Sequence, residues 1–287
     1  MATQHSISSK NYKLILSSLG AELVGLYWKG QDHNWIWSGD SWKRHAPVLF
    51  PIVGRLKGDR YTVDGKIYEL GQHGFARDTE FSVIESDSRS ITFKMSSSEQ
   101  TLAKYPYQFE FFVRYEVSDD DVAVSFRVCS EREIFFSCGW HPGFSFPNHK
   151  SLLGDMQVTS EAPDFSYQLL NGEGLIQPQL IVEAAPLVIQ DSTFQQDALI
   201  FKNGLGDLVE LSSKKAGVKI SMHIGGPSQF GIWSKNPAEF VCLEPWWGCA
   251  DLEASQGDLK SKFGIQQVLP NKEWQRVVRI QLSDVAI

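Results

Sequence analysis

The sequence predicts an all-β protein that folds as one large antiparallel β-sandwich. Three observations favour this fold: hydrophobic residues alternate with polar ones in many segments, long helical patterns are missing, and no linker interrupts the chain. Large β-sandwiches often reach 287 residues as one unit, so we expect a single domain over residues 1–287. Hydrophobic residues make up 42% of the chain, which is enough for a sizeable core.

The first expected elements come from short segments in the N-terminal half. Asp64-Gly65 is a typical hairpin turn, so residues 62–67 predict two short strands around it. Residues 91–95 alternate with period two and predict another strand. Residues 97–103 form the one segment that favours a short helix.

The clearest strands are residues 109–117 and residues 122–128. In each, aromatic and β-branched side chains occupy one face, while charged or small side chains occupy the other. Ser118-Asp119-Asp120-Asp121 between them consists of turn residues, so we expect an antiparallel hairpin. The same alternation predicts strands over residues 218–224 and 278–282.

Composition excludes several classes of function. The net charge of −7 is spread along the chain without a cluster of Lys and Arg, which argues against nucleic-acid binding. Residues 1–16 lack the pattern of a signal peptide, and no segment is apolar for long enough to span a bilayer. The four cysteines have no zinc-site spacing and are expected to be free buried thiols. We therefore expect a cytoplasmic protein that binds neither nucleic acid nor membranes.

Four irregular segments interrupt the strand pattern, and loops of this kind usually carry function on a rigid sandwich. In residues 46–56, two prolines and a glycine precede Arg55, which either binds hydroxyls or an anionic group or is a surface residue near a turn. In residues 72–78, His73 and Arg77 flank a glycine and can converge on a ligand. A plain ion pair between Arg77 and Asp78 explains the same residues equally well.

The third irregular segment, residues 138–147, carries His141 among Gly, Trp, Pro and Phe residues. A semi-apolar setting keeps the pKa of a histidine near neutrality or below it. Such a residue is suited to act as a general acid or base near pH 7.

The fourth irregular segment, residues 240–248, carries Glu244 after an apolar strand, followed by Pro245 and two tryptophans. A charge in an aromatic pocket is costly unless it is hydrogen-bonded or takes part in a reaction, so we favour a functional role for Glu244. The tryptophans either stack on the apolar faces of sugars or fill the core.

The sequence contains no pattern for a metal site or a cofactor. The histidines lack HxH and HExxH spacing, and neither a phosphate-binding glycine loop nor a dinucleotide-binding fingerprint is present. We therefore predict that neither a metal ion nor a cofactor takes part.

Together and in this order, the four segments resemble the aldose 1-epimerase (galactose mutarotase-like) superfamily. The wording LFPIVGRL, HGFARD, GWHPGF and EPWWG is most similar to short bacterial mutarotase-like proteins, typified by those encoded beside lactose-utilisation genes. HGFAR is also found in the glucose-6-phosphate 1-epimerase branch. The resemblance extends from Ala21-Glu22-Leu23 to Leu269-Pro270-Asn271. The chain departs from galactose mutarotase at residues 57–60 and 141–144, so the substrate preference of that enzyme cannot be transferred.

The resemblance implies an enzyme that interconverts the α and β anomers of an aldose without a cofactor. His141 corresponds to the general acid of the family and Glu244 to its general base. Asp197 resembles a hydroxyl-binding aspartate, although Asp191 is an alternative. The other implied substrate-binding residues are Arg55, His73, Arg77 and, by stacking on the sugar ring, Trp246.

The expected partner is a small sugar, either free or phosphorylated, and the protein is expected to be a monomer or a homodimer. Two other functions compete with an aldose 1-epimerase. A hexose-6-phosphate 1-epimerase would need a cationic pocket, which Arg44, Arg55 and Arg77 can supply. A sugar-binding or regulatory protein on the same scaffold would bind sugars without exchanging their anomers.

Overall fold

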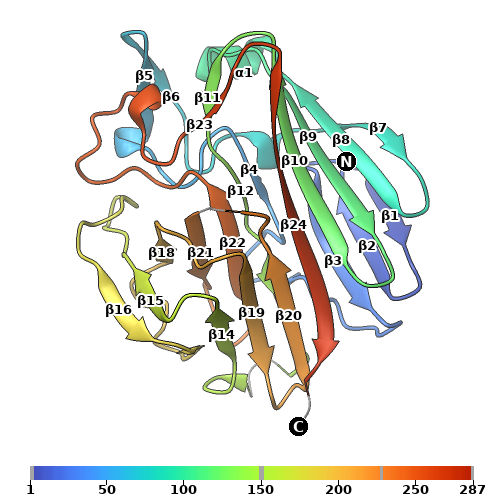
Figure 1. The fold of residues 1–287 in the computed structure, drawn as a ribbon. Helices are drawn as coiled ribbons and strands as arrows, with labels where there is room; N and C mark the ends of the chain where they lie inside the picture. The colour runs from blue at the N-terminus through green and yellow to red at the C-terminus, as the bar shows by residue number, and fades with distance from the viewer. Residues whose placement is uncertain (1–2, 149–151, 227–228, 286–287) are drawn as a thin grey trace.

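The computed structural model of the protein describes residues 3–148, 152–226 and 229–285. Strands dominate these residues, and the helix predicted over 97–103 is observed as α1 (Glu99–Lys104), capped by Ser98 and Thr101. The sheets are antiparallel (Figure 1), so the predicted all-β sandwich is confirmed. None of the helices in the described ranges is long and apolar enough to cross a membrane.

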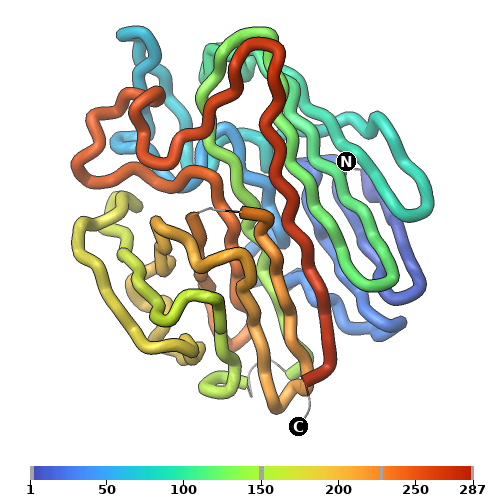
Figure 2. Tube along the Cα trace, in the orientation of Figure 1, coloured from blue at the N-terminus to red at the C-terminus, as the bar shows by residue number. Residues whose placement is uncertain are grey.

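The largest sheet contains nine strands. In spatial order they are β17 (Leu187–Val188), β14 (Gln157–Ser160), β19 (Leu208–Ser213), β20 (Val218–His223), β24 (Lys272–Asp284), β10 (Val122–Ser130), β9 (Glu110–Val117), β8 (Ser90–Ser96) and β7 (Ser82–Ser86). Figure 2 shows β24, in red, between β10 in green and β20 in orange. The last long strand therefore joins two parts of the sheet that are distant in sequence.

A second sheet carries Glu244 and Trp246, and His141 lies between two of its strands. Its strands are, in spatial order, β18 (Leu199–Phe201), β21 (Gln229–Trp233), β22 (Val241–Trp247), β12 (Cys138–Trp140) and β4 (Val48–Leu49), and β13 (Gly143–Phe144) also pairs with β22. Three of the four irregular segments thus contribute to one sheet.

The remaining strands form smaller sheets around these two. They are β1 (Gln4–Ser8), β2 (Tyr12–Ser17) and β3 (Glu22–Trp28); β5 (Arg60–Val63) and β6 (Lys66–Glu69); β11 (Ile134–Phe136) and β23 (Gln266–Val268); and β15 (Asp164–Tyr167) and β16 (Ile181–Ala184). Short 3₁₀ turns are found at η1 (Lys57–Asp59), η2 (Ala76–Asp78) and η4 (Leu259–Ser261).

The predicted strands are confirmed, and one of them is much longer than predicted. β9 and β10 form the expected antiparallel hairpin, in which Val117 pairs with Val122. β5 and β6 form the predicted hairpin at Asp64-Gly65. β24 begins at Lys272, earlier than the predicted residue 278. The alternation breaks within β24 because Arg276 and Val277 are both half-buried, which hides the first part of the strand from a sequence pattern.

The hydrophobic core lies between the two large sheets. Trp247 on β22 contacts Phe126 on β10 and Trp274 on β24, with ring centroids 6.0 Å and 5.5 Å apart. One contiguous cluster of buried side chains extends from Ile7 to Leu282. The prediction of buried thiols is confirmed for three cysteines but wrong for Cys129, which is half-buried beside Arg127 at the end of β10.

Candidate active site

Glu244 lies within β22, and two glycines on the flanking strands make room for its neighbour Trp246. Gly231 on β21 pairs with Glu244, and Gly139 on β12 pairs with Trp246. A Cβ atom at Gly231 would approach the Trp246 ring to 2.6 Å, and one at Gly139 to 2.7 Å. The glycines therefore allow the indole of Trp246 to lie across the sheet. β22 continues to Trp247, so Glu244 is not at the strand end that the sequence indicated.

His141 directly follows β12 and is held from both sides. Its backbone N–H donates to the carbonyl of Pro47 at 3.1 Å, and the indole N–H of Trp140 donates to the carbonyl of Ala46 at 3.0 Å. The Pro-rich segment before Arg55 thus fixes the loop that carries His141. The imidazole is buried, as its apolar sequence context predicts.

His141 Nε2 lies 3.2 Å from Glu244 Oε2, although the two residues are 103 positions apart in the chain (244 − 141). The Glu244 side chain is only 1% exposed. Within the described residues neither of its oxygens accepts a hydrogen bond. A buried carboxyl group without such partners is unfavourable for folding, so the arrangement is typical of a site that a ligand completes.

Burial favours the uncharged form of both groups. It raises the pKa of Glu244 well above its ordinary value, and the nearby negative charge of Asp197 raises it further. Burial also lowers the pKa of His141 to about 3, with smaller contributions from Arg77 and Arg44. Burial therefore favours a proton on Glu244 beside a neutral His141. The pair can both give and accept a proton.

His73 lies beside this pair, with its ring centroid 5.8 Å from that of His141. Its Nδ1 accepts a hydrogen bond from the N–H of Gly54 at 3.1 Å, so Nε2 carries the ring proton in the neutral form. Burial is the main cause that lowers the pKa of His73 well below its ordinary value. His73 is therefore a fixed neutral donor.

The two predicted arginines differ in their surroundings. The Arg77 side chain is largely buried and donates to the carbonyl of Gln72 at 2.9 Å, while its Nε finds no hydrogen-bond partner among the described residues. Burial and the neighbouring Arg44 lower the pKa of Arg77 to about 10. Arg55 is more exposed and pairs with Asp59 at 3.2 Å. The ion pair of Arg77 with Asp78 is long, at 3.7 Å, so it does not account for the buried guanidinium.

Asp197 precedes β18 and adopts a left-handed backbone conformation, with φ at 71°. One of its carboxylate oxygens accepts the N–H of Ala198 at 2.9 Å. Asp197 lines the same cavity as Glu244, whereas Asp191 is exposed and does not. The structure therefore brings Asp197, and not Asp191, to the other predicted residues.

All seven predicted site residues line one cavity of about 310 Å³. This volume is within the range of small-ligand sites. The wall combines cationic, anionic and aromatic side chains. The predicted residues that it contains are Arg55, His73, Arg77, His141, Asp197, Glu244 and Trp246.

The cavity also contains two tryptophans that the sequence analysis did not select. Trp42 stacks on the His141 ring at 4.9 Å, and Trp233 meets the same ring edge-on at 5.6 Å. Trp42 lies in a polar loop, Gly39-Asp40-Ser41-Trp42, and this polar context is the one feature of the sequence that hints at a place in the site. Both rings limit the positions that the imidazole of His141 can take.

The described residues contain one group with the composition of a metal site. Cys242 shares a face of β22 with Glu244, and the ligand atoms of His141, Cys242 and Glu244 all lie within 4.8 Å of one another. A thiol must lose its proton before it binds a metal ion. Burial raises the pKa of Cys242 well above its ordinary value, which opposes that loss. The absence of a metal from the reaction stays a prediction.

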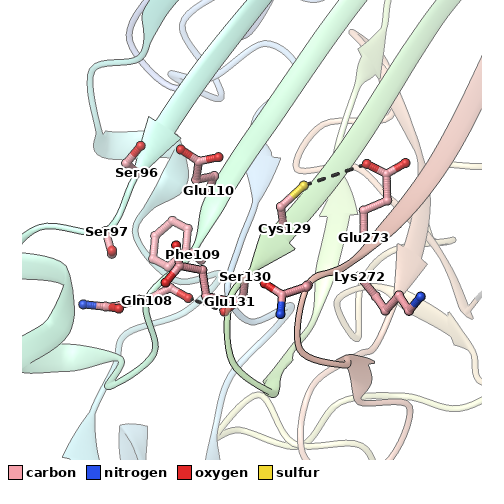
Figure 3. Close-up of a pocket in the computed structure, with 11 residues that line it drawn as sticks. Ser96, Ser97, Gln108, Phe109, Glu110, Cys129, Ser130, Glu131, Lys272 and Glu273 are labelled. Carbon is pink, nitrogen blue, oxygen red and sulfur yellow. Dashed lines mark hydrogen bonds between the residues drawn. The ribbon is translucent and has the colours of Figure 1, made fainter.

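A larger hollow, of about 740 Å³, lies on the largest sheet away from these residues (Figure 3). It is formed where β8 ends, β9 begins, β10 ends and β24 begins, and Cys129 and Glu273 lie in it with 4.0 Å between sulfur and carboxylate. It contains none of the predicted residues and no buried acid–base pair. The smaller cavity is therefore the better candidate site.

Comparison with known proteins identifies relatives over nearly the whole chain. The family model for aldose 1-epimerase matches residues 3–277. The chromosomal protein LacX of Lactococcus lactis is 27% identical, covering 92% of this chain and 95% of that protein. A galactose mutarotase related enzyme from Lactobacillus acidophilus superimposes with a TM-score of 0.91 and 33% identity, covering 99% and 100% of the two chains. A galactose mutarotase-like protein from Lactobacillus casei gives a TM-score of 0.90 and 25% identity, covering 98% and 100%.

Proposed function

Since the chain belongs to the aldose 1-epimerase family, we propose that it interconverts the α and β anomers of an aldose by acid–base opening of the sugar ring. Membership of this superfamily, predicted from four loop motifs, is confirmed. The observation that carries the proposal is the buried contact of 3.2 Å between His141 and Glu244 at the cavity.

The reaction requires one group that gives a proton and one that accepts a proton. Glu244 removes the proton of the C1 hydroxyl while His141 protonates the ring oxygen, and the bond between C1 and the ring oxygen breaks. The open-chain aldehyde rotates about its C1–C2 bond. Ring closure from the other face then returns both protons, with the roles of the two residues reversed.

These roles require the shared proton to lie on His141 at the moment of ring opening. Burial by itself favours the proton on Glu244. A hydroxyl that donates a hydrogen bond to Glu244 stabilises the carboxylate form, so a bound sugar favours transfer of the proton across the 3.2 Å contact. The pair carries one proton before and after this transfer, which is the number that the reaction needs.

Other residues of the cavity bind and orient the sugar. The fixed Nε2–H of His73 and the guanidinium groups of Arg55 and Arg77 donate to hydroxyls, and Asp197 accepts from them. Trp246 offers an aromatic surface for the apolar face of the ring. Binding of this kind holds the reacting atoms near the acid–base pair.

The pH dependence of kcat/KM tests whether this pair works with a single proton. At low pH the pair loses activity when it binds a second proton, which must go to His141. The lowered pKa of His141 therefore places the acidic limb near pH 3, below the limb that an ordinary carboxyl group would give. Loss of the only proton requires ionisation of Glu244, so the raised pKa moves the basic limb above the usual carboxyl range. We expect kcat/KM to change by less than about twofold between pH 4 and pH 6.

Asp197→Asn provides the control for this profile. Removing the negative charge of Asp197 lowers the pKa of Glu244, so the basic limb should move to lower pH whatever happens to KM. A wild-type profile that falls steeply below pH 5 while circular dichroism shows an intact fold would contradict the single-proton pair.

Polarimetry tests the function itself. Freshly dissolved α-anomers of glucose, galactose and other aldoses should approach their equilibrium rotation faster with the protein than in buffer alone, and the Glu244→Gln variant serves as the control. If calorimetry shows that sugars bind while every rotation changes at the buffer rate, the protein is a sugar-binding protein and not an epimerase.

A hexose-6-phosphate 1-epimerase is the second candidate, favoured by the cationic side of the cavity. In the described part of the chain the buried Nε of Arg77 lacks a hydrogen-bond partner. Arg55 lines the same wall, and Arg44 lies near Arg77. A phosphate group is well matched to such guanidinium donors. Including glucose 6-phosphate in the polarimetry panel decides between the two, because a phosphate-dependent enzyme would turn it over with a much higher kcat/KM than glucose.

A further inference from the structure

A buried ion pair lies behind the wall of the cavity and takes no part in the proposed reaction. Lys262 Nζ and Asp251 Oδ1 are 2.7 Å apart, and their side chains are only 3% and 2% exposed. Neither residue lines the cavity. An ion pair without solvent around it is weak support for stability, because removing two charges from water offsets their attraction. A geometric role explains its presence better.

Asp251 connects the pair to the loop that carries Arg55. Its second carboxylate oxygen accepts the backbone N–H of Lys57 at 3.0 Å. Its own N–H donates to the carbonyl of Arg55 at 2.8 Å. The same aspartate therefore fixes the carbonyl of Arg55 itself and the amide of Lys57, two positions later.

Asp251 also fixes the segment on the other side of Arg55. Its carbonyl accepts the N–H of Ile176 at 2.9 Å, and Ile176 follows Gly174 closely in the chain. A Cβ atom at Gly174 would lie 2.8 Å from Cδ of Arg55, so this backbone packs directly on the arginine side chain. The arginine thus packs on one of two segments that meet at Asp251.

The same loop extends the connection to His73. Gly54 precedes Arg55, donates its N–H to Nδ1 of His73 and accepts the backbone N–H of His73 at 2.9 Å. A Cβ atom at Gly54 would lie 2.5 Å from Cβ of Ala250, next to Asp251. The position of this loop therefore affects both Arg55 and the ring of His73.

We propose that the Asp251–Lys262 pair is a positioning device that holds Arg55, and through Gly54 also His73, at the distance from the acid–base pair that sugar binding requires. That the ligand is a sugar rests on the proposed function. The connection of the ion pair to the loop does not depend on it. Both residues act through the loop and not by touching the substrate, so they affect binding more than proton transfer.

The double variant Asp251→Leu/Lys262→Met tests the proposal. It replaces the ion pair by apolar side chains of similar size, a change that buried ion pairs often tolerate without loss of stability. We expect KM for the best sugar to rise about tenfold with kcat within about twofold of wild type, as loss of one charged hydrogen bond in binding predicts. We also expect faster amide hydrogen exchange at Lys57 and Ile176, while amides of β10 remain unchanged.

A second variant isolates the hydrogen bond if the double variant does not fold. Lys57→Pro removes the N–H that Asp251 accepts, at the first position of η1, where proline is well tolerated. The matched control Lys57→Met keeps this N–H and removes only the ammonium group. KM should rise with Lys57→Pro and stay within about twofold of wild type with Lys57→Met.

Asp155→Leu controls for the general loss of a carboxylate that joins two loops. Asp155 accepts hydrogen bonds from the hydroxyl of Ser213 and the N–H of Lys215, away from the cavity, so its variant should leave KM unchanged.

Unchanged amide hydrogen exchange at Lys57 and Ile176 in the folded double variant would overturn the positioning role. If the wild-type protein is active, an unchanged KM in the double variant would also overturn it. If the wild-type protein exchanges no anomers, the proposed function fails, and hydrogen exchange still decides on the loop connection.

Discussion

Replacing Glu244 by Gln is expected to lower kcat for anomer exchange by about 10²- to 10⁴-fold, the usual contribution of one general acid or base. The amide keeps the approximate shape of the side chain but cannot take the proton of the C1 hydroxyl. Because burial favours the uncharged form of Glu244, a neutral amide should preserve the packing of β22. The loss should therefore appear in kcat far more than in KM, as measured by polarimetry over a range of sugar concentrations.

Glu210→Gln is the matched control for this substitution. Glu210 is a half-buried glutamate on β19 that pairs with Lys219 and does not line the cavity. Its variant should exchange anomers at the wild-type rate. Near-normal kcat in Glu244→Gln, with thermal unfolding as in wild type, would show that Glu244 is a structural residue and that another group accepts the proton.

Strand pairing in the large sheet can be predicted from sequence where a strand has one buried face and one more exposed face. β9 and β10 meet this condition, and four turn residues separate them, so their boundaries and pairing follow from alternation alone. β22 does not meet it, because all seven of its residues are buried. Its length, and hence the position of Glu244 within the strand, depends on neighbours that are remote in sequence. The expectation of one domain and of a cytoplasmic location stays a prediction.

The candidate site is partly predictable because reactive side chains in apolar or glycine-rich loops stand out. His141 and Glu244 are examples, and the family resemblance assigned roles to them. Trp42 carries no such signal, since a tryptophan in a polar loop is compatible with many positions, and only the fold places it on the His141 ring. Asp251 and Lys262 are harder still. Each resembles an ordinary surface charge in the sequence, and their burial becomes visible only when the loops around Arg55 and Ile176 are assembled.

Replacing His141 by Asn is expected to reduce kcat for anomer exchange by about the same 10²- to 10⁴-fold factor, because the ring oxygen then loses its proton donor. Asparagine also removes the ring that packs on Trp42 and Trp233, so we expect a stability loss of about 0.5–1.5 kcal/mol for each of these two aromatic pairs. Thermal unfolding measures this second effect separately from catalysis. Sugar affinity, measured by calorimetry, should change little.

The double variant His141→Asn/Glu244→Gln distinguishes a working pair from two independent residues. If the two side chains share one proton across their 3.2 Å contact, removing either one disables the same step, so the second substitution should lower the remaining rate only slightly. The rate of the double variant, after subtraction of the buffer rate, should therefore be close to that of the slower single variant. Independent contributions would instead multiply to about 10⁴-fold or more. A multiplicative loss would mean that His141 and Glu244 act in separate steps, and the shared-proton mechanism would have to be abandoned.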